Sequence, residues 1–176
     1  MAIEIINDPG YSPQSSDNLR AYEMVHSHDS DQYFSSKHGI IVSRNEKEIC
    51  SAIILCAGGA TGINEKSAII KNGLIFICCG NSVCSLRLTN LTFNWLIEID
   101  VATCFGIYEF ENDFVIHGEM EISRITEEGK IVWQFSGRDI FVNIHGEREF
   151  EIIGDQIKLV DFLNNNYFLD KNGQEI

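Results

Sequence analysis

Two glycine–tryptophan pairs repeat at a fixed distance in the middle of this 176-residue chain. Gly80 and Trp95 recur as Gly118 and Trp133, with an offset of 15 positions within each pair and of 38 positions between the pairs. A short apolar run precedes both glycines, and a third such run leads into Gly154 with no tryptophan after it. Repeats of this length that hold several short strands are typical of propeller blades, whereas helical solenoids show apolar residues at helical spacing. We expect the two tryptophans to occupy equivalent buried positions in successive blades.

The length of the chain limits the number of blades. A blade takes about 40–45 residues and a closed ring needs at least about four. Residues 39–56 are typical of a further hairpin, with two apolar runs around the polar turn Asn45-Glu46-Lys47. The sequence therefore predicts an all-β fold over residues 38–176, an incomplete β-propeller-like array of antiparallel meander sheets with about three blades. An incomplete array leaves a sheet face or edge unpaired, where a partner can dock.

Residues 1–37 differ from the rest of the chain in composition. Both prolines, Pro9 and Pro13, lie here in a stretch rich in Gly, Ser and Asn. Such a stretch favours turns, so we predict an irregular N-terminal arm. Residues 18–25 are the place in this arm where a short helix could form, with Asp17 as its N-cap.

One copy of the repeat carries a more specific spacing, because Gly129 is followed four residues later by Trp133. This spacing resembles the blade motif of quinoprotein-like (pyrroloquinoline-quinone-type) β-propellers, over about the second half of the chain. The chain departs from the family pattern where Ile125 stands at the family's aspartate and Leu91 at the turn glycine of the preceding copy. The resemblance implies the propeller architecture. It does not carry the family's quinone and calcium onto residues that fail to match, so no cofactor is expected.

The chain has six cysteines, and each lies among Ile, Leu, Val or Phe. No pair shows the Cys-x2-Cys spacing of a zinc knuckle, and two of the six are adjacent, so that on a strand they point to opposite faces. We predict free thiols that serve as small core side chains. They are Cys50, Cys56, Cys78, Cys79, Cys84 and Cys104.

Residues 26–31 form the one metal-like cluster in the sequence. His26 and His28, followed by Asp29 and Asp31, could ligate zinc or a similar ion. A solvated loop is the alternative, and we predict no metal site.

Catalytic patterns are missing from the sequence. His117 and His145 could still be paired by the fold, but no Gly-x-Ser-x-Gly elbow or other nucleophile pattern accompanies them. We expect no catalytic residues and no enzymatic activity.

Charge gives the strongest indication of a partner. The chain has 26 acidic and 13 basic residues and a formal net charge of −13. This excess disfavours nucleic acid and anionic membranes and attracts basic proteins. No run approaches the ~18 apolar residues of a membrane span, and the N-terminus lacks the basic start and apolar core of an export signal. We expect a cytoplasmic protein with a basic protein partner, and its oligomeric state stays open.

Carboxylates are concentrated at residues 109–113, 119–121, 127–128 and 147–151. At period two, Glu119 and Glu121 would share one solvated strand face, with Met120 and Ile122 pointing inward. Ordinary solubility would also explain these charges. The hypothesis is a partner-binding face made of Glu109, Phe110, Glu111, Asp113, Glu119 and Glu121.

These observations favour a non-enzymatic, acidic protein-binding module. In size, acidity, expected compartment and lack of a catalytic pattern the chain is similar to small acidic toxin-immunity proteins. That likeness implies an inhibitor that neutralises a basic nuclease-type toxin by covering its phosphate-binding cleft with carboxylates. The alternatives are a small metal- or ligand-binding enzyme that uses residues 26–31, and a propeller fragment that assembles with itself through its open edge.

Overall fold

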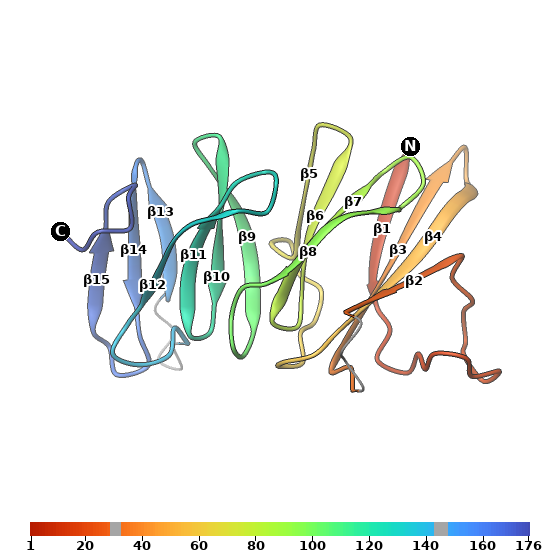
Figure 1. Ribbon diagram of the computed structural model, residues 1–176, viewed down its shortest axis with the longest axis horizontal. Coiled ribbons are helices and arrows are strands. Elements are labelled where there is room, and N and C mark those ends of the chain that lie inside the picture. The colour runs from red at the N-terminus through yellow and green to blue at the C-terminus, as the bar shows by residue number, and fades with distance from the viewer. Residues whose placement is uncertain (29–32, 143–147) are drawn as a thin grey trace.

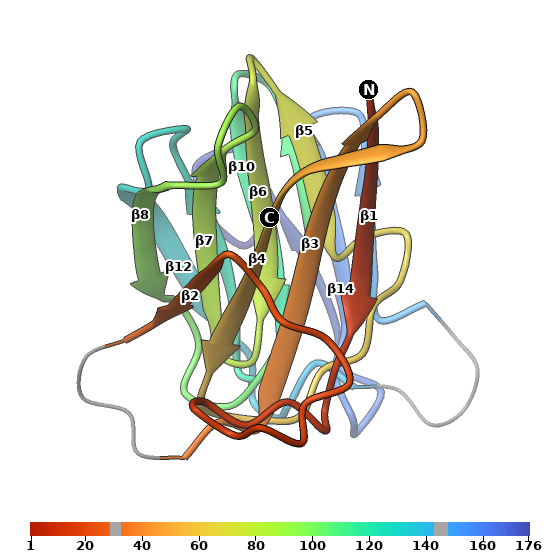
Figure 2. The ribbon, with the colours of Figure 1, turned by 90° about the vertical axis from the view of Figure 1, so that its right-hand side faces the viewer.

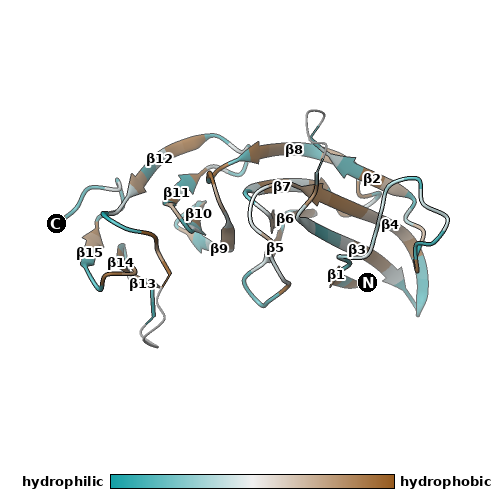
Figure 3. Cartoon of the chain, turned by 90° about the horizontal axis from the view of Figure 1, so that it is seen from below, coloured by the Kyte–Doolittle hydropathy of each residue, from teal (hydrophilic) through white to brown (hydrophobic). Residues whose placement is uncertain are grey.

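The computed structural model describes residues 1–28, 33–142 and 148–176. Within these ranges the regular secondary structure consists of β-strands. The strands form four sheets, called sheets 1 to 4 in chain order. The sheets stand side by side (Figure 1) and follow an arc when seen from below (Figure 3). None of the described residues belongs to a helix that could cross a membrane. The all-β, propeller-like prediction is therefore confirmed.

Sheet 1 takes two of its strands from the arm that was expected to be irregular. Its order is β1-β3-β4-β2, in which β1 pairs antiparallel with β3 and β2 pairs parallel with β4. The strands are β1 Ala2–Asn7, β2 Met24–Ser27, β3 Ser36–Arg44 and β4 Lys47–Cys56. The arm thus completes a fourth sheet beyond the three blades expected.

Sheets 2 and 3 are the two copies of the glycine–tryptophan repeat. Each is a four-stranded antiparallel meander, and its strands follow chain order from the concave to the convex edge of the arc (Figure 3). Sheet 2 contains β5 Ala68–Lys71, β6 Leu74–Cys79, β7 Ser82–Arg87 and β8 Phe93–Glu98. Sheet 3 contains β9 Cys104–Phe110, β10 Asp113–Gly118, β11 Glu121–Ile125 and β12 Ile131–Ser136.

Sheet 4 is the third, incomplete copy. It has three strands, β13 Phe150–Ile153, β14 Gln156–Val160 and β15 Asn166–Leu169. The segment after β15 turns back along it, where Leu169 forms a bridge with Glu175 and the Ile176 N–H donates to the Phe168 carbonyl at 2.9 Å. No tryptophan follows, in agreement with the sequence pattern.

Each pair of neighbouring sheets shares an apolar core. Between sheets 2 and 3, for example, the rings of Phe76 and Phe114 lie 4.5 Å apart and neither is exposed. The central strands face a core on both sides, and accordingly residues 75–79 of β6 are all buried. Burial on both faces explains why this strand is a continuous apolar run rather than an alternating one.

The six cysteines are free and buried, as expected. Four of them, Cys50, Cys56, Cys79 and Cys84, belong to the core between sheets 1 and 2. Burial raises the pKa of the Cys78 thiol to about 12, which keeps it protonated and unreactive.

The cap segment, residues 8–23, covers the outward face of sheet 1. Tyr11 and Tyr22 pack edge to face, and with Phe34 they cover Ile53 and Leu55 of β4. Figure 2 shows this segment crossing in front of the sheet. One end of the array is therefore closed by the chain itself.

The short helix expected over residues 18–25 is not present. Instead, the side chain of Asn18 accepts a hydrogen bond from the Ser12 N–H and donates to the carbonyls of Ser12 and Ser15. Such side-chain to backbone bonds compete with helix formation. The residues that follow, Met24–Ser27, form β2 and pair with β4.

The two tryptophans do occupy equivalent positions, at the convex rim rather than in the core, and both are half-buried. Trp95 donates from Nε1 to the Glu127 carbonyl at 3.0 Å, and its ring lies against Gly129 in the next sheet. Trp133 repeats this contact with the Lys171 carbonyl, also at 3.0 Å, and with Gly173. Each tryptophan thus fastens its sheet to a turn of the following one.

A histidine takes this place between sheets 1 and 2. His26 on β2 hydrogen-bonds through Nε2 to the Leu91 carbonyl at 2.8 Å, and its ring packs 4.2 Å from that of Phe93. Leu91 has a φ of 52°, the left-handed conformation that glycine adopts in the other two turns. The rim contact is therefore preserved although the glycine and tryptophan are not.

Replacing Gly129 with alanine should destabilise the fold in two ways. The residue has a φ of 77°, and an added Cβ would lie 2.7 Å from the Trp95 ring. The left-handed conformation alone costs about 1–2 kcal/mol, and displacing the indole should add about 1–3 kcal/mol. Urea unfolding measures the loss.

The matched control is Gly154→Ala. Gly154 has a similar φ of 65°, but an added Cβ would meet nothing within 4 Å. It should show the conformational cost alone. Equal losses for the two variants would mean that the Trp95 contact contributes nothing to stability.

Candidate functional site

The residues proposed for the partner-binding face separate into two groups. Glu109, Glu111 and Asp113 lie around the β9–β10 turn, whereas Glu119 and Glu121 lie at the opposite end of sheet 3. The six-residue strand β10 runs between the groups, a length of about 20 Å at 3.3 Å per residue. The structure does not bring the six residues into one patch.

Phe110 cannot contribute to a surface. It is 3% exposed and packs in the core between sheets 3 and 4, with the Arg124 guanidinium over its ring at 5.2 Å. The same arginine pairs with Glu111 at 2.7 Å and with Asp113 at 2.8 Å. Two of the proposed carboxylates are therefore neutralised within the chain, while Glu109 is exposed.

The alternation expected from residue 119 begins two residues later, at Glu121. Met120 is 39% exposed and does not point inward, whereas Ile122 is fully buried. Asp100 holds the segment in a turn, because its Oδ2 accepts the N–H groups of Met120 and Glu121, each at 2.9 Å. Strand β11 starts at Glu121, so the period-two pattern does not apply to the two residues before it.

The metal-like cluster lies partly outside the described residues, which do not include Asp29 and Asp31. His145, considered above as a catalytic histidine, also lies outside them. His26 uses its Nε2 in the rim contact with Leu91. Among the residues that the structure does describe, no three His, Cys, Asp or Glu side chains are placed to hold a metal ion.

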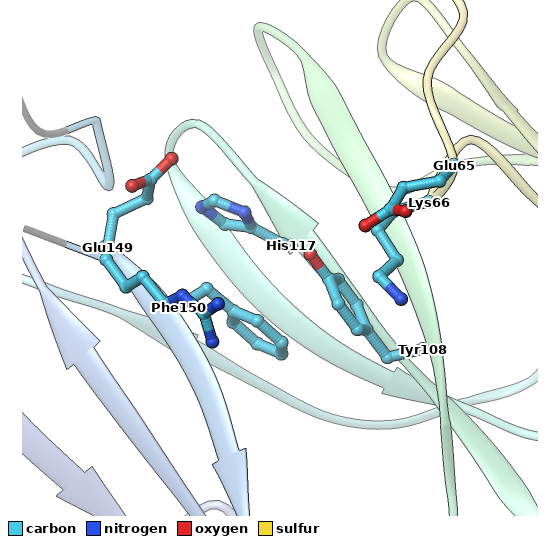
Figure 4. A pocket seen from close by; sticks show the side chains of 7 residues that line it. Glu65, Lys66, Tyr108, His117, Glu149 and Phe150 are labelled. Atoms are coloured by element: carbon cyan, nitrogen blue, oxygen red, sulfur yellow. The ribbon is translucent and has the colours of Figure 1, made fainter.

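A pocket of about 380 Å³ lies on the concave side of the array, where sheets 2, 3 and 4 approach one another (Figure 4). Three short stretches line it, residues 65–66 before β5, Tyr108 and His117 in sheet 3, and residues 148–150 at the start of β13. A second hollow of about 300 Å³ adjoins it and shares Glu65, Lys66 and Tyr108. Glu109, one of the six residues predicted to bind a partner, lines this second hollow.

Aromatic rings form the floor of the pocket. The Phe150 ring lies 4.5 Å from that of Tyr108 and is stacked on that of His117 at 5.1 Å with an interplanar angle of 13°. His117 hydrogen-bonds through Nε2 to the Phe141 carbonyl at 3.1 Å. Burial lowers the pKa of His117 below its usual 6.5, so its ring is neutral at pH 7.

Charged side chains surround this floor. The Lys66 ammonium lies over the Tyr108 ring, 5.8 Å from its centroid. Burial raises the pKa of the Tyr108 phenol, and the negative charges of Glu149 and Glu65 raise it further. Both carboxylates are therefore close enough to act on the same hydroxyl, and they reach it from different sheets.

The pocket offers aromatic ring faces and charged side chains to a ligand. Within the described part of the chain, His117 forms no hydrogen bond with a hydroxyl, thiol or carboxylate. Stacking surfaces and fixed charges can hold a ligand in place. The sequence did not predict this pocket because its residues come from three separate repeats. The local signals were two charged dipeptides, Glu65-Lys66 before β5 and Arg148-Glu149 before β13.

Comparison with known proteins supports the fold. No family model and no curated protein sequence matches the chain. Among solved structures, BamB from Moraxella catarrhalis has a TM-score of 0.52 at 11% identity, over 78% of this chain and 41% of that one. The computationally designed protein Ika8 also has a TM-score of 0.52, at 8% identity, over 80% of this chain and 44% of that one.

The chain spans less than half the length of either structure. At these identities the likeness shows the fold alone. BamB is a pyrroloquinoline-quinone-type β-propeller, so the architectural part of the family resemblance is confirmed and the chain has a β-propeller-like fold.

Acidification below pH 6.5 should destabilise the protein. Burial lowers the pKa of both His117 and His38 from 6.5, so below that pH the unfolded chain binds protons that the folded chain excludes. Their stabilising effect is complete above pH 6.5 and is lost as the pH falls, by at most about 1.4 kcal/mol per pH unit for each histidine. Urea unfolding between pH 7.5 and 5.5 measures this slope.

The variant His117→Gln tests whether His117 contributes to this pH dependence, because the glutamine amide can still donate to the Phe141 carbonyl but cannot titrate. Its stability should fall less steeply with acidification. The same slope in variant and parent would show that His117 does not contribute to the pH dependence.

Proposed function

We propose that this chain is a non-enzymatic module that binds a basic protein, as an immunity or inhibitor protein for a nuclease-type toxin in the cytoplasm. The observation that carries the proposal is the groove formed by the pocket and the adjoining hollow on the concave side. In this groove aromatic rings lie between Glu65, Glu109 and Glu149, which come from three neighbouring sheets or the residues just before them. The net charge of −13 supports it, because a strongly acidic chain attracts basic partners at long range.

The groove keeps its carboxylates free for a partner. Among the described residues, Glu65, Glu109 and Glu149 make no ion pair within 4 Å, in contrast to Glu111 and Asp113. Charges already paired within the chain contribute little to a new contact. Unpaired ones can meet the cations of a partner.

The rigidity of the sheets suits this role. A nuclease cleft is built to hold phosphates, and carboxylates fixed on sheets can take the place of those phosphates without reordering the chain. Exposed charges mainly accelerate association, whereas buried contacts such as the aromatic floor slow dissociation. Both components occur together in this groove.

The test is association kinetics with a basic partner isolated by affinity capture. Glu109→Lys and Glu65→Lys should each slow association several-fold at low salt, and the rate of the parent should fall as salt screens the attraction. The matched control is Glu46→Lys, which changes the net charge equally but lies in the exposed β3–β4 turn of sheet 1.

Capture of only acidic proteins would reject the proposal. So would association rates that respond neither to salt nor to the two substitutions. An equal effect of Glu46→Lys would assign the attraction to net charge and not to this side of the molecule.

A further inference from the structure

The pocket of Figure 4 has the features of a site for a flat cation. Its two carboxylates stand on opposite sides, Glu65 from the approach to sheet 2 and Glu149 from the approach to sheet 4. The Tyr108 and Phe150 rings lie between them. Aromatic faces attract cations through the ring quadrupole, most strongly where water is excluded.

A cation of the chain itself already lies over this aromatic floor. The ammonium of Lys66 already lies over the Tyr108 ring at 5.8 Å. Lys66 is exposed, so its side chain can swing away when another cation enters. The neutral His117 ring below adds no positive charge that would repel the incoming group.

The second basic residue of the lining, Arg148, also belongs to the pocket and acts on the Tyr108 phenol. Arg148 has a side chain 82% exposed, with its Nη1 3.9 Å from Glu151. Because the side chains of Lys66 and Arg148 are both exposed, both can move aside and leave Glu65 and Glu149 facing the pocket.

We propose that this pocket binds the guanidinium group of an arginine side chain presented by the partner protein. A guanidinium is planar and can stack on Tyr108 or Phe150 while its edge donates paired hydrogen bonds to a carboxylate, which a lysine ammonium cannot do. The volume of about 380 Å³ suits a single side chain. The inference rests on the proposed function, because it names the residue type of the basic partner that this site would recognise.

The test compares two isosteric probes on the intact chain by NMR titration. Nα-acetyl-arginine amide should bind at least about tenfold more tightly than Nα-acetyl-citrulline amide, which has the same shape without the charge. Glu149→Gln should weaken arginine binding about tenfold, and Lys66→Met should strengthen it by removing the resident cation. The matched control is Glu98→Gln, the same change on the exposed end of β8, which should leave binding unchanged.

Tyr108→Leu tests the floor and should also weaken arginine binding. Because Tyr108 packs on Phe150, its fold is checked by circular dichroism, and Glu149→Gln keeps the test valid if the leucine variant does not fold. Equal binding of arginine and citrulline probes would overturn the inference. Preferential binding of an acetyl-glutamate probe would overturn it as well, by showing that the positive charges of Lys66 and Arg148 make the pocket prefer anions.

Failure of this inference can be told apart from failure of the proposed function. A basic partner whose binding depends on salt and on Glu109 but is unchanged by Glu149→Gln rejects the arginine pocket alone. An arginine probe that binds as expected, in a chain that captures no basic protein, rejects the proposed partner and leaves the pocket standing.

Discussion

Packing of one sheet on the next is the interaction on which the whole structure depends. The central strands are apolar on both faces, so no sheet here can bury its side chains without neighbours. The rim contacts of His26, Trp95 and Trp133 then fix how each sheet meets the following one. The outward faces of the two end sheets have no neighbouring sheet to cover them. Sheet 1 is covered by the cap segment, and sheet 4 turns a mixed face, with Glu151 paired across from Lys158, away from the core.

The same packing creates the pocket. Because the rim contacts hold the sheets at set positions, the residues just before the inner strands of sheets 2 and 4 meet over the floor provided by sheet 3. Glu65 and Glu149 are far apart in sequence but act on one phenol, that of Tyr108. The side chains of Lys66 and Arg148 are exposed, so they can move aside when a ligand enters. A preorganised site of this kind avoids the ordering cost of binding.

The glycine–tryptophan repeat predicted the strands of sheets 2 and 3 and the equivalence of Trp95 and Trp133, because the repeat itself encodes the rim contact. It could not predict sheet 1, where β2 joins by parallel pairing and His26 replaces the tryptophan. The charge runs included Glu109, which borders the pocket, but misplaced Phe110, since alternation within β9 turns that ring toward the core. The pocket was not predicted because its walls come from three repeats, and no local sequence pattern indicates that these residues lie close together.

A crystal structure of the chain with its basic partner would test the central claim most directly. The account predicts that the partner covers the concave edge between sheets 2 and 4, with an arginine side chain stacked on Tyr108 or Phe150 and paired with Glu65 or Glu149. A partner seated on the convex rim or on the outward face of sheet 4, with this pocket open to solvent, would contradict it.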